Sequence, residues 1–270
     1  MTEANAPDDE PGGEAVEARP KPRRRGIYIL PNLFTTAALF GGFYAIVMAM
    51  NERFEHAAVA IFVAMVLDGA DGRIARLTNT QSDFGAEYDS LSDVVSFGIA
   101  PALVMYQWAL ASMGKLGWIA SFFYAAATAL RLARFNTQLG VADKRYFQGL
   151  PCPAAAGVIA GLLWVGVEQE MSGPDVAPVV LVALLFSGAL MVSNVRFNSF
   201  KELDLKGRVP FIMTLAIVLV VATVSYDPPI VLFAVFALYA LSGPCMTLVQ
   251  IRRRRAARHT DSSRNRGDSN

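Results

Sequence analysis

Four aspartates have a spacing that places their carboxylates on two helical faces. Asp68 and Asp71 lie three residues apart near the end of one apolar segment, and Asp89 and Asp93 lie four apart near the start of the next. Residues three or four apart share one face of a helix. Because only a short turn separates the two segments, we expect these faces to meet and the four carboxylates to converge.

A cluster of four carboxylates beside apolar helices favours a metal site. One acidic side chain at mid-membrane costs about 2.5–3.5 kcal/mol on insertion scales, and several together also repel one another. A cation removes this penalty, and oxygen ligands suit Mg²⁺, Mn²⁺ or Ca²⁺ better than Zn²⁺. Helix caps and surface carboxylates are the alternative interpretation, which suits Asp83 or Glu87 alone better than the whole set.

Small residues flank the aspartates where a ligand would approach the backbone. Gly72 follows Asp71 in the place of a better helix former, at a cost of up to about 1 kcal/mol. Ala75 and Gly85 leave similar room on their own helices. Arg76 lies one turn beyond Gly72, and its guanidinium suits a phosphate group. The pattern therefore predicts a metal site next to a phosphate-binding surface.

Long apolar helices must hold these residues. Of the 270 residues, 54% are hydrophobic and 17% are charged, against roughly 25% charged in soluble domains. A helix needs about 20 apolar residues to cross a bilayer, and the apolar runs are too long for barrel strands. We expect an all-α, polytopic membrane protein with about eight transmembrane helices. The expected segments are about 32–51, 56–77, 85–111, 116–136, 153–169, 177–195, 209–226 and 229–250.

Charge predicts the domain organisation and the orientation. Residues 1–25 are predicted to be a disordered tail, 26–251 the membrane-embedded catalytic domain, and 252–270 a basic disordered tail. Lys and Arg gather on the side that holds both termini, and only Arg53 and Lys115 fall opposite. By the positive-inside rule, we expect both termini and the carboxylates at the cytoplasmic face of the inner (cytoplasmic) membrane.

The remaining chemistry-bearing residue types predict nothing further. Cys152 and Cys245 lie far apart without metal-ligand spacing, so we interpret both as buried small apolar residues. His56 is expected on the far side and His259 in the basic tail, so neither supports histidine chemistry. The Arg252–Arg255 run is typical of a membrane-flanking anchor that touches anionic headgroups. We therefore expect a lipid bilayer and no nucleic acid as a partner.

The aspartate segment resembles the signature of the CDP-alcohol phosphotransferase family. The pattern D-x-x-D-G-x-x-A-R, eight residues, then G-x-x-x-D-x-x-x-D, is matched at every fixed position from Asp68 to Asp93. The resemblance implies that family's membrane fold and CDP-diacylglycerol as the lipid substrate. It also implies Mg²⁺ or Mn²⁺ as cofactor, with two ions expected.

The resemblance also implies a role for each motif residue. Asp68, Asp71 and Asp89 look like metal ligands, and Asp93 looks like both a ligand and the general base that takes the proton of an alcohol. The alkoxide would attack the β-phosphorus of the CDP-linked lipid and CMP would leave. An ordinary helix start is the alternative for residues 31–34. The positions that resemble the family's nucleotide-binding residues are Pro31, Asn32, Leu33, Phe34, Gly72, Ala75, Arg76, Ser82 and Gly85.

Two later strings bear on the acceptor alcohol. R-L-A-R-F-N, from Arg131 to Asn136, and G-L-P-C-P-A-A-A, from Gly149 to Ala156, resemble segments of the bacterial CDP-diacylglycerol–serine O-phosphatidyltransferases, a branch of that family. An arginine fork suits a carboxylate such as that of L-serine. Arg131, Arg134 and Asn136 are therefore candidates for serine binding. Membrane anchoring for the arginines and helix capping for the asparagine are the alternatives.

Several interpretations remain open from the sequence. The same chemistry with glycerol 3-phosphate or an inositol derivative would keep the motif, although a phosphate-bearing acceptor calls for more basic residues. A cation-coupled transporter would also place carboxylates in a membrane, but no polar path continues through the other helices. Gly41-Gly42 and Gly157-x-x-x-Gly161 predict close helix contacts, either inside the chain or in a homodimer.

Overall fold

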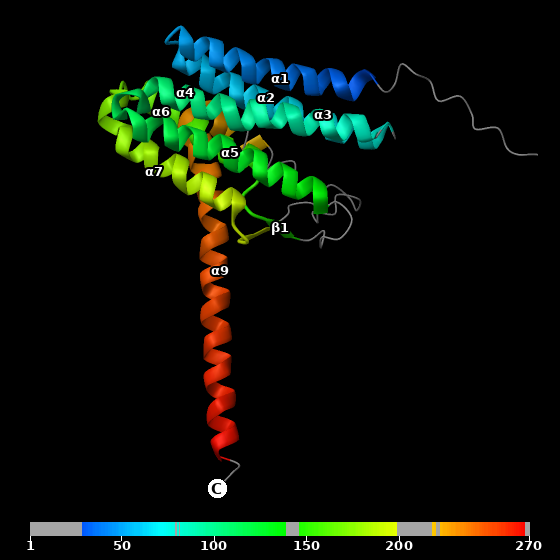
Figure 1. The fold of residues 1–270 in the computed structure, drawn as a ribbon, viewed down its shortest axis with the longest axis vertical. Coiled ribbons are helices and arrows are strands. Elements are labelled where there is room, and N and C mark those ends of the chain that lie inside the picture. The colour runs from blue at the N-terminus through cyan, green and yellow to red at the C-terminus, as the bar shows by residue number, and fades with distance from the viewer. Residues whose placement is uncertain are drawn as a thin grey trace, which may run out of the picture.

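A computed structural model describes the fold of most of the chain. Residues 29–78, 80, 82–138, 146–198, 218–219 and 222–267 are described. Figure 1 shows a bundle of helices from which α9 extends. The elements are α1 (Ile29–Met50), α2 (Phe54–Leu77), α3 (Asp83–Asp93), η2 (Val94–Ile99), α4 (Ala100–Trp108), η3 (Leu110–Met113), α5 (Lys115–Gln138), β1 (Tyr146–Gln148), α6 (Cys152–Glu168), α7 (Gly173–Val192), β2 (Arg196–Asn198) and α9 (Pro228–Gly267).

Every predicted membrane segment except 209–226 has a helical counterpart, and 209–226 falls mostly outside the described residues. Within the described part, four helices are long and apolar enough to cross a membrane, and α6 is apolar but shorter. The α2 helix and the α3–α4 segment carry the aspartate pairs. The four helices that qualify by length and composition are Leu30–Met50, Lys115–Thr137, Gly173–Val192 and Pro228–Thr247.

The segment predicted as one helix over 85–111 is interrupted by η2, a π-helical stretch. Pro101 lacks the N–H that would bond the carbonyl of Phe97 in a regular α-helix, and its ring would press on that carbonyl. The N–H of Ala100, the residue before this proline, bonds the carbonyl of Val95 five residues earlier, in the π-helical pattern. The Tyr124 hydroxyl of α5 donates to the Phe97 carbonyl at 3.1 Å. A neighbouring helix thus satisfies the backbone group that the proline leaves without its usual donor.

Two other features differ from the sequence-based expectation. The expected all-α class is confirmed, since almost all elements are helices, but a short antiparallel sheet that was not expected pairs Phe147 of β1 with Phe197 of β2. Three-residue strands are too short to show an alternating pattern. The α9 helix continues to Gly267, where a disordered tail was predicted from residue 252. Arginine and alanine are good helix formers, and extending an existing helix avoids the cost of nucleation. The predicted tail 1–25 lies outside the described residues.

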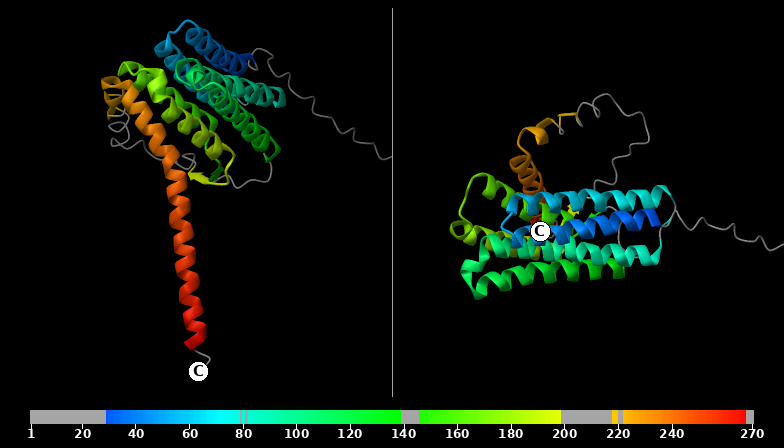
Figure 2. Two further views of the ribbon diagram at one scale, coloured as in Figure 1. Left: turned by 60° about the vertical axis from the view of Figure 1, so that its left-hand side comes forward. Right: turned by 90° about the horizontal axis from the view of Figure 1, so that it is seen from above.

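Small residues let α1 approach both α2 and the α3–α4 segment closely. The views in Figure 2 show α1, α2, this segment and α5 side by side. A Cβ on Gly41 would lie 3.0 Å from the Cβ of Ala64 on α2, and one on Gly42 would lie 2.6 Å from the Cα of Ser96. The neighbouring contact surfaces are largely alanine. The α2 helix and the α3–α4 segment therefore both pack closely against α1.

The second glycine pair also serves packing inside the chain. A Cβ on Gly157 would lie 2.6 Å from the ring of Phe236, and one on Gly161 would lie 2.8 Å from the backbone of Phe233. Both aromatic residues belong to α9. Of the two alternatives left open by the sequence, the structure therefore assigns these glycines, like Gly41 and Gly42, to internal helix contacts.

We predict that Gly42→Ala destabilises the protein by about 1–3 kcal/mol, because the added methyl group overlaps the Ser96 backbone and overpacked cores lose about this much. Thermal unfolding of the purified protein in detergent measures the effect. Gly69→Ala is the matched control, since no atom lies within 4 Å of the added Cβ. Equal melting temperatures for the two variants would contradict the close α1–η2 contact.

Candidate active site

Three of the predicted carboxylates lie close enough to share one cation. Asp68 and Asp71 of α2 and Asp89 of α3 each offer an oxygen, and these oxygens lie within 4.8 Å of one another. The fourth, Asp93, is the last residue of α3, one turn after Asp89. Its carboxylate and that of Asp89 both lie within hydrogen-bonding range of Asp68. The structure therefore brings the four aspartates together, as their spacing predicts.

The surroundings of these carboxylates fit a hard divalent cation. Oδ1 of Asp89 and Oδ1 of Asp93 are buried and have no hydrogen-bond partner, and the Asp71 side chain is only 5% exposed. Leaving a buried polar atom unpaired costs about 1–3 kcal/mol, and more for a charged group. A ligand set made only of carboxylate oxygens suits Mg²⁺ or Mn²⁺. A bound cation would use the oxygens that otherwise lack a partner.

The first helix orients one of the ligands. The buried Thr35 hydroxyl donates to Oδ2 of Asp71 at 2.7 Å. Partners of this kind fix the orientation of a metal ligand and raise its affinity. The sequence motif does not include Thr35. In the sequence, this role is indicated only by the position of Thr35, one helical turn after Pro31, on the helix whose start resembles the nucleotide-binding element of the family.

Two serines attach the helix end that carries Asp93 to the same helix. The Ser92 hydroxyl donates to the Thr35 carbonyl at 3.2 Å, and the Ser96 hydroxyl donates to the Ala38 carbonyl at 3.0 Å. All of these side chains are buried. Asp93 lies between the two serines and directly before the π-helical segment. Such segments are frequent at functional sites, where they reorient the adjoining helix.

The predicted nucleotide-binding residues gather where α1, α2 and α3 meet. Asn32 Oδ1 lies 3.4 Å from the position that a Gly85 Cβ would take, so the starts of α1 and α3 adjoin. Ser82 is the N-cap of α3, and its hydroxyl accepts the Gly85 N–H at 3.1 Å. Arg76 folds back over Gly72, with Nη1 3.5 Å from the corresponding Cβ position. The capping role of Ser82 was not expected. The other predicted members, Pro31, Leu33, Phe34 and Ala75, lie on the same parts of α1 and α2.

The structure separates the three residues predicted to bind the acceptor. Arg134 donates through Nη2 to Oδ1 of Asn194 at 2.6 Å and to Oε1 of Gln148, so it connects α5 with β1 and with the turn after α7. Asn136 donates to the hydroxyl of Ser90 at 3.0 Å, one residue beyond Asp89. Arg131 and Arg134 therefore do not bind the same partner.

Arg131 points to a different part of the bundle. Its Nη1 donates to Sγ of Cys152 at 3.1 Å, while its Nε is buried and has no partner. Arg131 and Asp93 both lie near enough to this thiol to act on it electrostatically. Arg131 and Asp93 thus each have a buried atom without a hydrogen-bond partner, and both act electrostatically on the same thiol.

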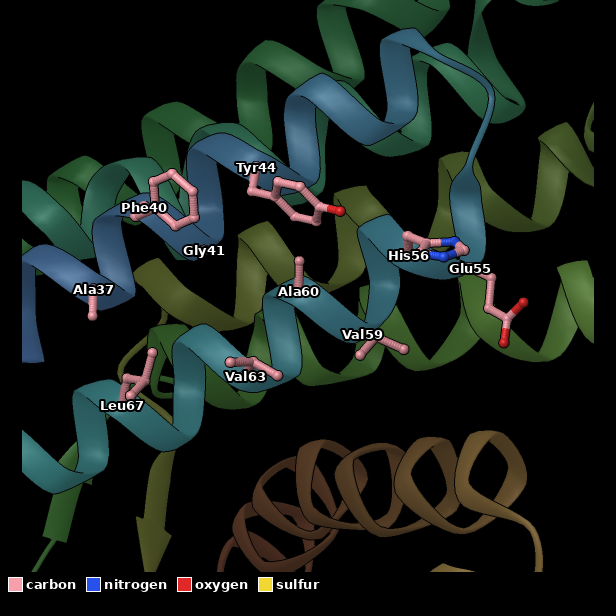
Figure 3. A pocket seen from close by; sticks show the side chains of 10 residues that line it. All are labelled: Ala37, Phe40, Gly41, Tyr44, Glu55, His56, Val59, Ala60, Val63 and Leu67. Atoms are coloured by element: carbon pink, nitrogen blue, oxygen red, sulfur yellow. The ribbon is translucent and has the colours of Figure 1, made fainter.

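A separate apolar groove runs between α1 and α2. Figure 3 shows aromatic and aliphatic side chains along its two sides and Gly41 and Ala60 between them. Its volume is about 520 Å³. Leu67, at one end, directly precedes Asp68, but none of the four aspartates lines the groove. His56 and Glu55 lie at the opposite end, so the groove offers neither a metal site nor a base next to the carboxylates. The lining residues are Ala37, Phe40, Gly41, Tyr44, Glu55, His56, Val59, Ala60, Val63 and Leu67.

Comparison with known proteins agrees with this site. A family model described as CDP-alcohol phosphatidyltransferase matches residues 28–192, which is more than half of the chain. This range includes all four aspartates as well as Arg131 and Cys152.

Three relatives show how far the similarity extends. The CDP-diacylglycerol–serine O-phosphatidyltransferase of Helicobacter pylori is 38% identical over 176 residues, which cover 65% of this chain and 74% of the relative. The protein of the same name from Mycobacterium tuberculosis is 43% identical over 152 residues, covering 53% of this chain and 52% of the relative. An archaetidylserine synthase of Methanothermobacter thermautotrophicus is 31% identical over 170 residues, covering 62% and 69%.

We predict that Thr35→Val weakens Mn²⁺ binding by about 10- to 100-fold, because Asp71 loses the hydroxyl that orients it. The dissociation constant can be measured by electron paramagnetic resonance of free Mn²⁺ in a titration. Thr36→Val is the matched control, since the exposed Thr36 hydroxyl contacts Tyr88 and not an aspartate. Unchanged Mn²⁺ affinity in Thr35→Val would show that α1 does not support the metal site.

Proposed function

The chain belongs to the CDP-alcohol phosphatidyltransferase family, and from that membership we propose that it transfers the phosphatidyl group of CDP-diacylglycerol to the hydroxyl of L-serine. The products are phosphatidylserine and CMP. The helical bundle is the membrane fold of this family, and the chain is a multi-pass membrane enzyme. The observation that carries the proposal is the unpaired Oδ1 of Asp93 beside the carboxylate cluster, together with the buried, unpaired Nε of Arg131 on α5.

We assign the role of general base to Asp93. Its Oδ1 is buried and accepts no hydrogen bond, so a substrate hydroxyl can donate to it. As this proton moves to Asp93, the serine oxygen forms a bond to the phosphorus that carries the diacylglycerol. The bond from that phosphorus to CMP breaks, and CMP keeps the electron pair. A divalent cation held by Asp68, Asp71 and Asp89 would neutralise charge on the diphosphate.

The phosphate-binding side of the site is formed by α1, α2 and α3. Arg76 is exposed and folds over Gly72, where its guanidinium can reach a phosphate oxygen. Asn32 and Gly85 lie together at the starts of α1 and α3. These positions adjoin the metal ligands on both helices. We therefore assign the CDP group to this junction.

Arg131 is the residue that we assign to the serine carboxylate. A guanidinium forms strong charge-assisted hydrogen bonds to carboxylates, and Arg131 retains a buried N–H without a partner. Arg134, whose head group is engaged by Gln148 and Asn194, supports the architecture around it. Asn136 bonds Ser90 and is assigned to the alignment of α3 with α5.

We further propose that both termini and the carboxylates face the cytoplasm, in the inner (cytoplasmic) membrane. The concentration of Lys and Arg on that side supports this orientation. Mg²⁺ or Mn²⁺ as the ion, two ions per site and a homodimer remain predictions from the sequence and the family.

An acceptor panel in one CMP-release assay tests the proposed function. Purified protein with Mg²⁺ or Mn²⁺ and CDP-diacylglycerol is expected to release CMP when L-serine is added. Glycerol 3-phosphate and myo-inositol are expected to give little release. Release with either of these and not with serine would contradict the acceptor assignment. Cation flux in vesicles without any CMP release would favour a transporter instead.

We predict that Asp93→Asn lowers CMP release by about 10²- to 10⁴-fold, the usual contribution of a general base. The amide cannot take the hydroxyl proton, whereas Asp68, Asp71 and Asp89 remain as ligands. Mn²⁺ binding should therefore be largely retained. Asp83→Asn, in the exposed first turn of the same helix, is the matched control and should behave as wild type. Full activity of Asp93→Asn would exclude Asp93 as the base.

We predict that replacing each of the two arginines of α5 by glutamine changes a different property of the enzyme. Arg131→Gln should raise KM for serine at least tenfold, because hydrogen bonds to charged groups contribute about 1.5–3 kcal/mol. Arg134→Gln should mainly lower the melting temperature, because it removes a connection between α5, β1 and the end of α7. Steady-state kinetics and thermal unfolding of both variants provide the comparison. The reverse pattern would assign the acceptor to Arg134.

A further inference from the structure

Cys152 has an unexpected contact for a residue interpreted from the sequence as simple packing. It is the first residue of α6, is fully buried, and accepts a hydrogen bond from Nη1 of Arg131 at 3.1 Å. Asp93 lies close enough to act electrostatically on the same thiol. The sulfur therefore contacts the residue assigned to the serine carboxylate and lies within electrostatic range of the residue assigned as the base.

The thiol holds the guanidinium without neutralising its charge. Sulfur is a weak hydrogen-bond acceptor and the thiol is uncharged, and within the described part of the chain Arg131 forms no ion pair. A carboxylate in this place would pair with Arg131 and weaken its attraction for an anionic substrate. The neutral Sγ of Cys152 orients the Nη1–H of Arg131 and leaves Nε unpaired. The positive charge of the guanidinium therefore stays available to a substrate carboxylate.

The loop before α6 fixes the position of this sulfur. Gly149 has a positive φ of +78°, and a Cβ there would lie 2.2 Å from the Met191 carbonyl oxygen. Its N–H bonds the Val195 carbonyl at 2.9 Å, and the Leu150 N–H bonds the Leu190 carbonyl at 3.1 Å. The chain therefore enters α6 pressed against the end of α7. Because the backbone is held on this side, Sγ of Cys152 can serve as a fixed point for a long side chain.

We propose that Cys152 is a positioning residue that sets acceptor specificity, its Sγ holding Arg131 so that the free guanidinium N–H groups face the carboxylate of the acceptor beside Asp93. This inference rests on the proposed function. It makes the thiol responsible for the affinity for serine and gives it no part in binding the CDP-linked lipid, whose phosphates belong to the α1–α2–α3 junction.

Kinetics of full-length enzyme variants test the proposal. Cys152→Ala should raise KM for L-serine roughly tenfold, the low end for a hydrogen bond to a charged group, while KM for CDP-diacylglycerol changes less than about twofold. Cys152→Ser, whose hydroxyl can accept the same N–H, should restore KM for serine to within about threefold of wild type. Cys245→Ala, which removes the exposed cysteine of α9, is the matched control and should leave both constants unchanged.

A double mutant shows whether Cys152 acts through Arg131. In an Arg131→Gln background, Cys152→Ala should raise KM for serine no further, because coupled residues are not additive. A purely structural role would instead produce an additive loss, or raise both KM values together, and either result would overturn the proposal. A KM for serine that is no lower in Cys152→Ser than in Cys152→Ala would also overturn the proposal.

A second pair of variants applies if the alanine variant does not fold. Cys152→Thr and Cys152→Val have nearly equal volumes, and only threonine can accept the Arg131 N–H, so KM for serine should be lower in the threonine variant. Wild-type enzyme that uses glycerol 3-phosphate and not serine would contradict the proposed function. Wild-type enzyme that uses serine, with an unchanged KM in Cys152→Ala, would contradict only the positioning role.

Discussion

Four carboxylates held together among apolar helices repel one another and lose hydration, so the surrounding structure has to hold them in place until a cation binds. Two of them come from α2 and two from α3, and α1 packs against both helices. Gly41 and Gly42 permit that close approach. Thr35 then supplies a side-chain donor to Asp71 and a backbone acceptor to Ser92. The helix that provides no metal ligand is thus the one that aligns the ligands.

The predictable part of the site follows from spacing along single helices. The separations between Asp68 and Asp71 and between Asp89 and Asp93 determine which side chains share a face, whatever the neighbouring helices do. Apolar runs likewise predict the positions of the membrane helices. These are local properties of the chain, and within the described residues the structure agrees with them apart from the interruption at η2. The contact between Ser82 and Gly85 was not expected, but it is equally local and could have been predicted, since a serine three residues before Gly85 is an ordinary N-cap signal.

What could not be predicted depends on contacts between residues distant in the sequence. Arg131 and Arg134 share a helical face by spacing. Arg134 nevertheless bonds Gln148 of β1 and Asn194 in the turn after α7, whereas Arg131 bonds Cys152. The interruption at η2 depends jointly on Pro101 and on the Tyr124 hydroxyl from another helix. Strands of three residues become strands only because they pair with each other. Each outcome is decided by packing between elements, which periodicity does not report.

Asp93 belongs both to the carboxylate cluster and to the side of the site that we assign to the acceptor. The hydrogen bonds of the helical segment around it explain this position. Toward α1, Ser92 and Ser96 bind backbone carbonyls on either side of it. Toward α5, the Phe97 carbonyl accepts from Tyr124, and Ser90 accepts from Asn136. The proposed base is therefore held by the helix that orients the candidate metal ligands and also by the helix that carries Arg131. A general base needs hydrogen-bond reach to the alcohol more than it needs a matched affinity for protons. Attachment from both sides would give Asp93 a fixed position relative to the proposed phosphate and acceptor sites at once.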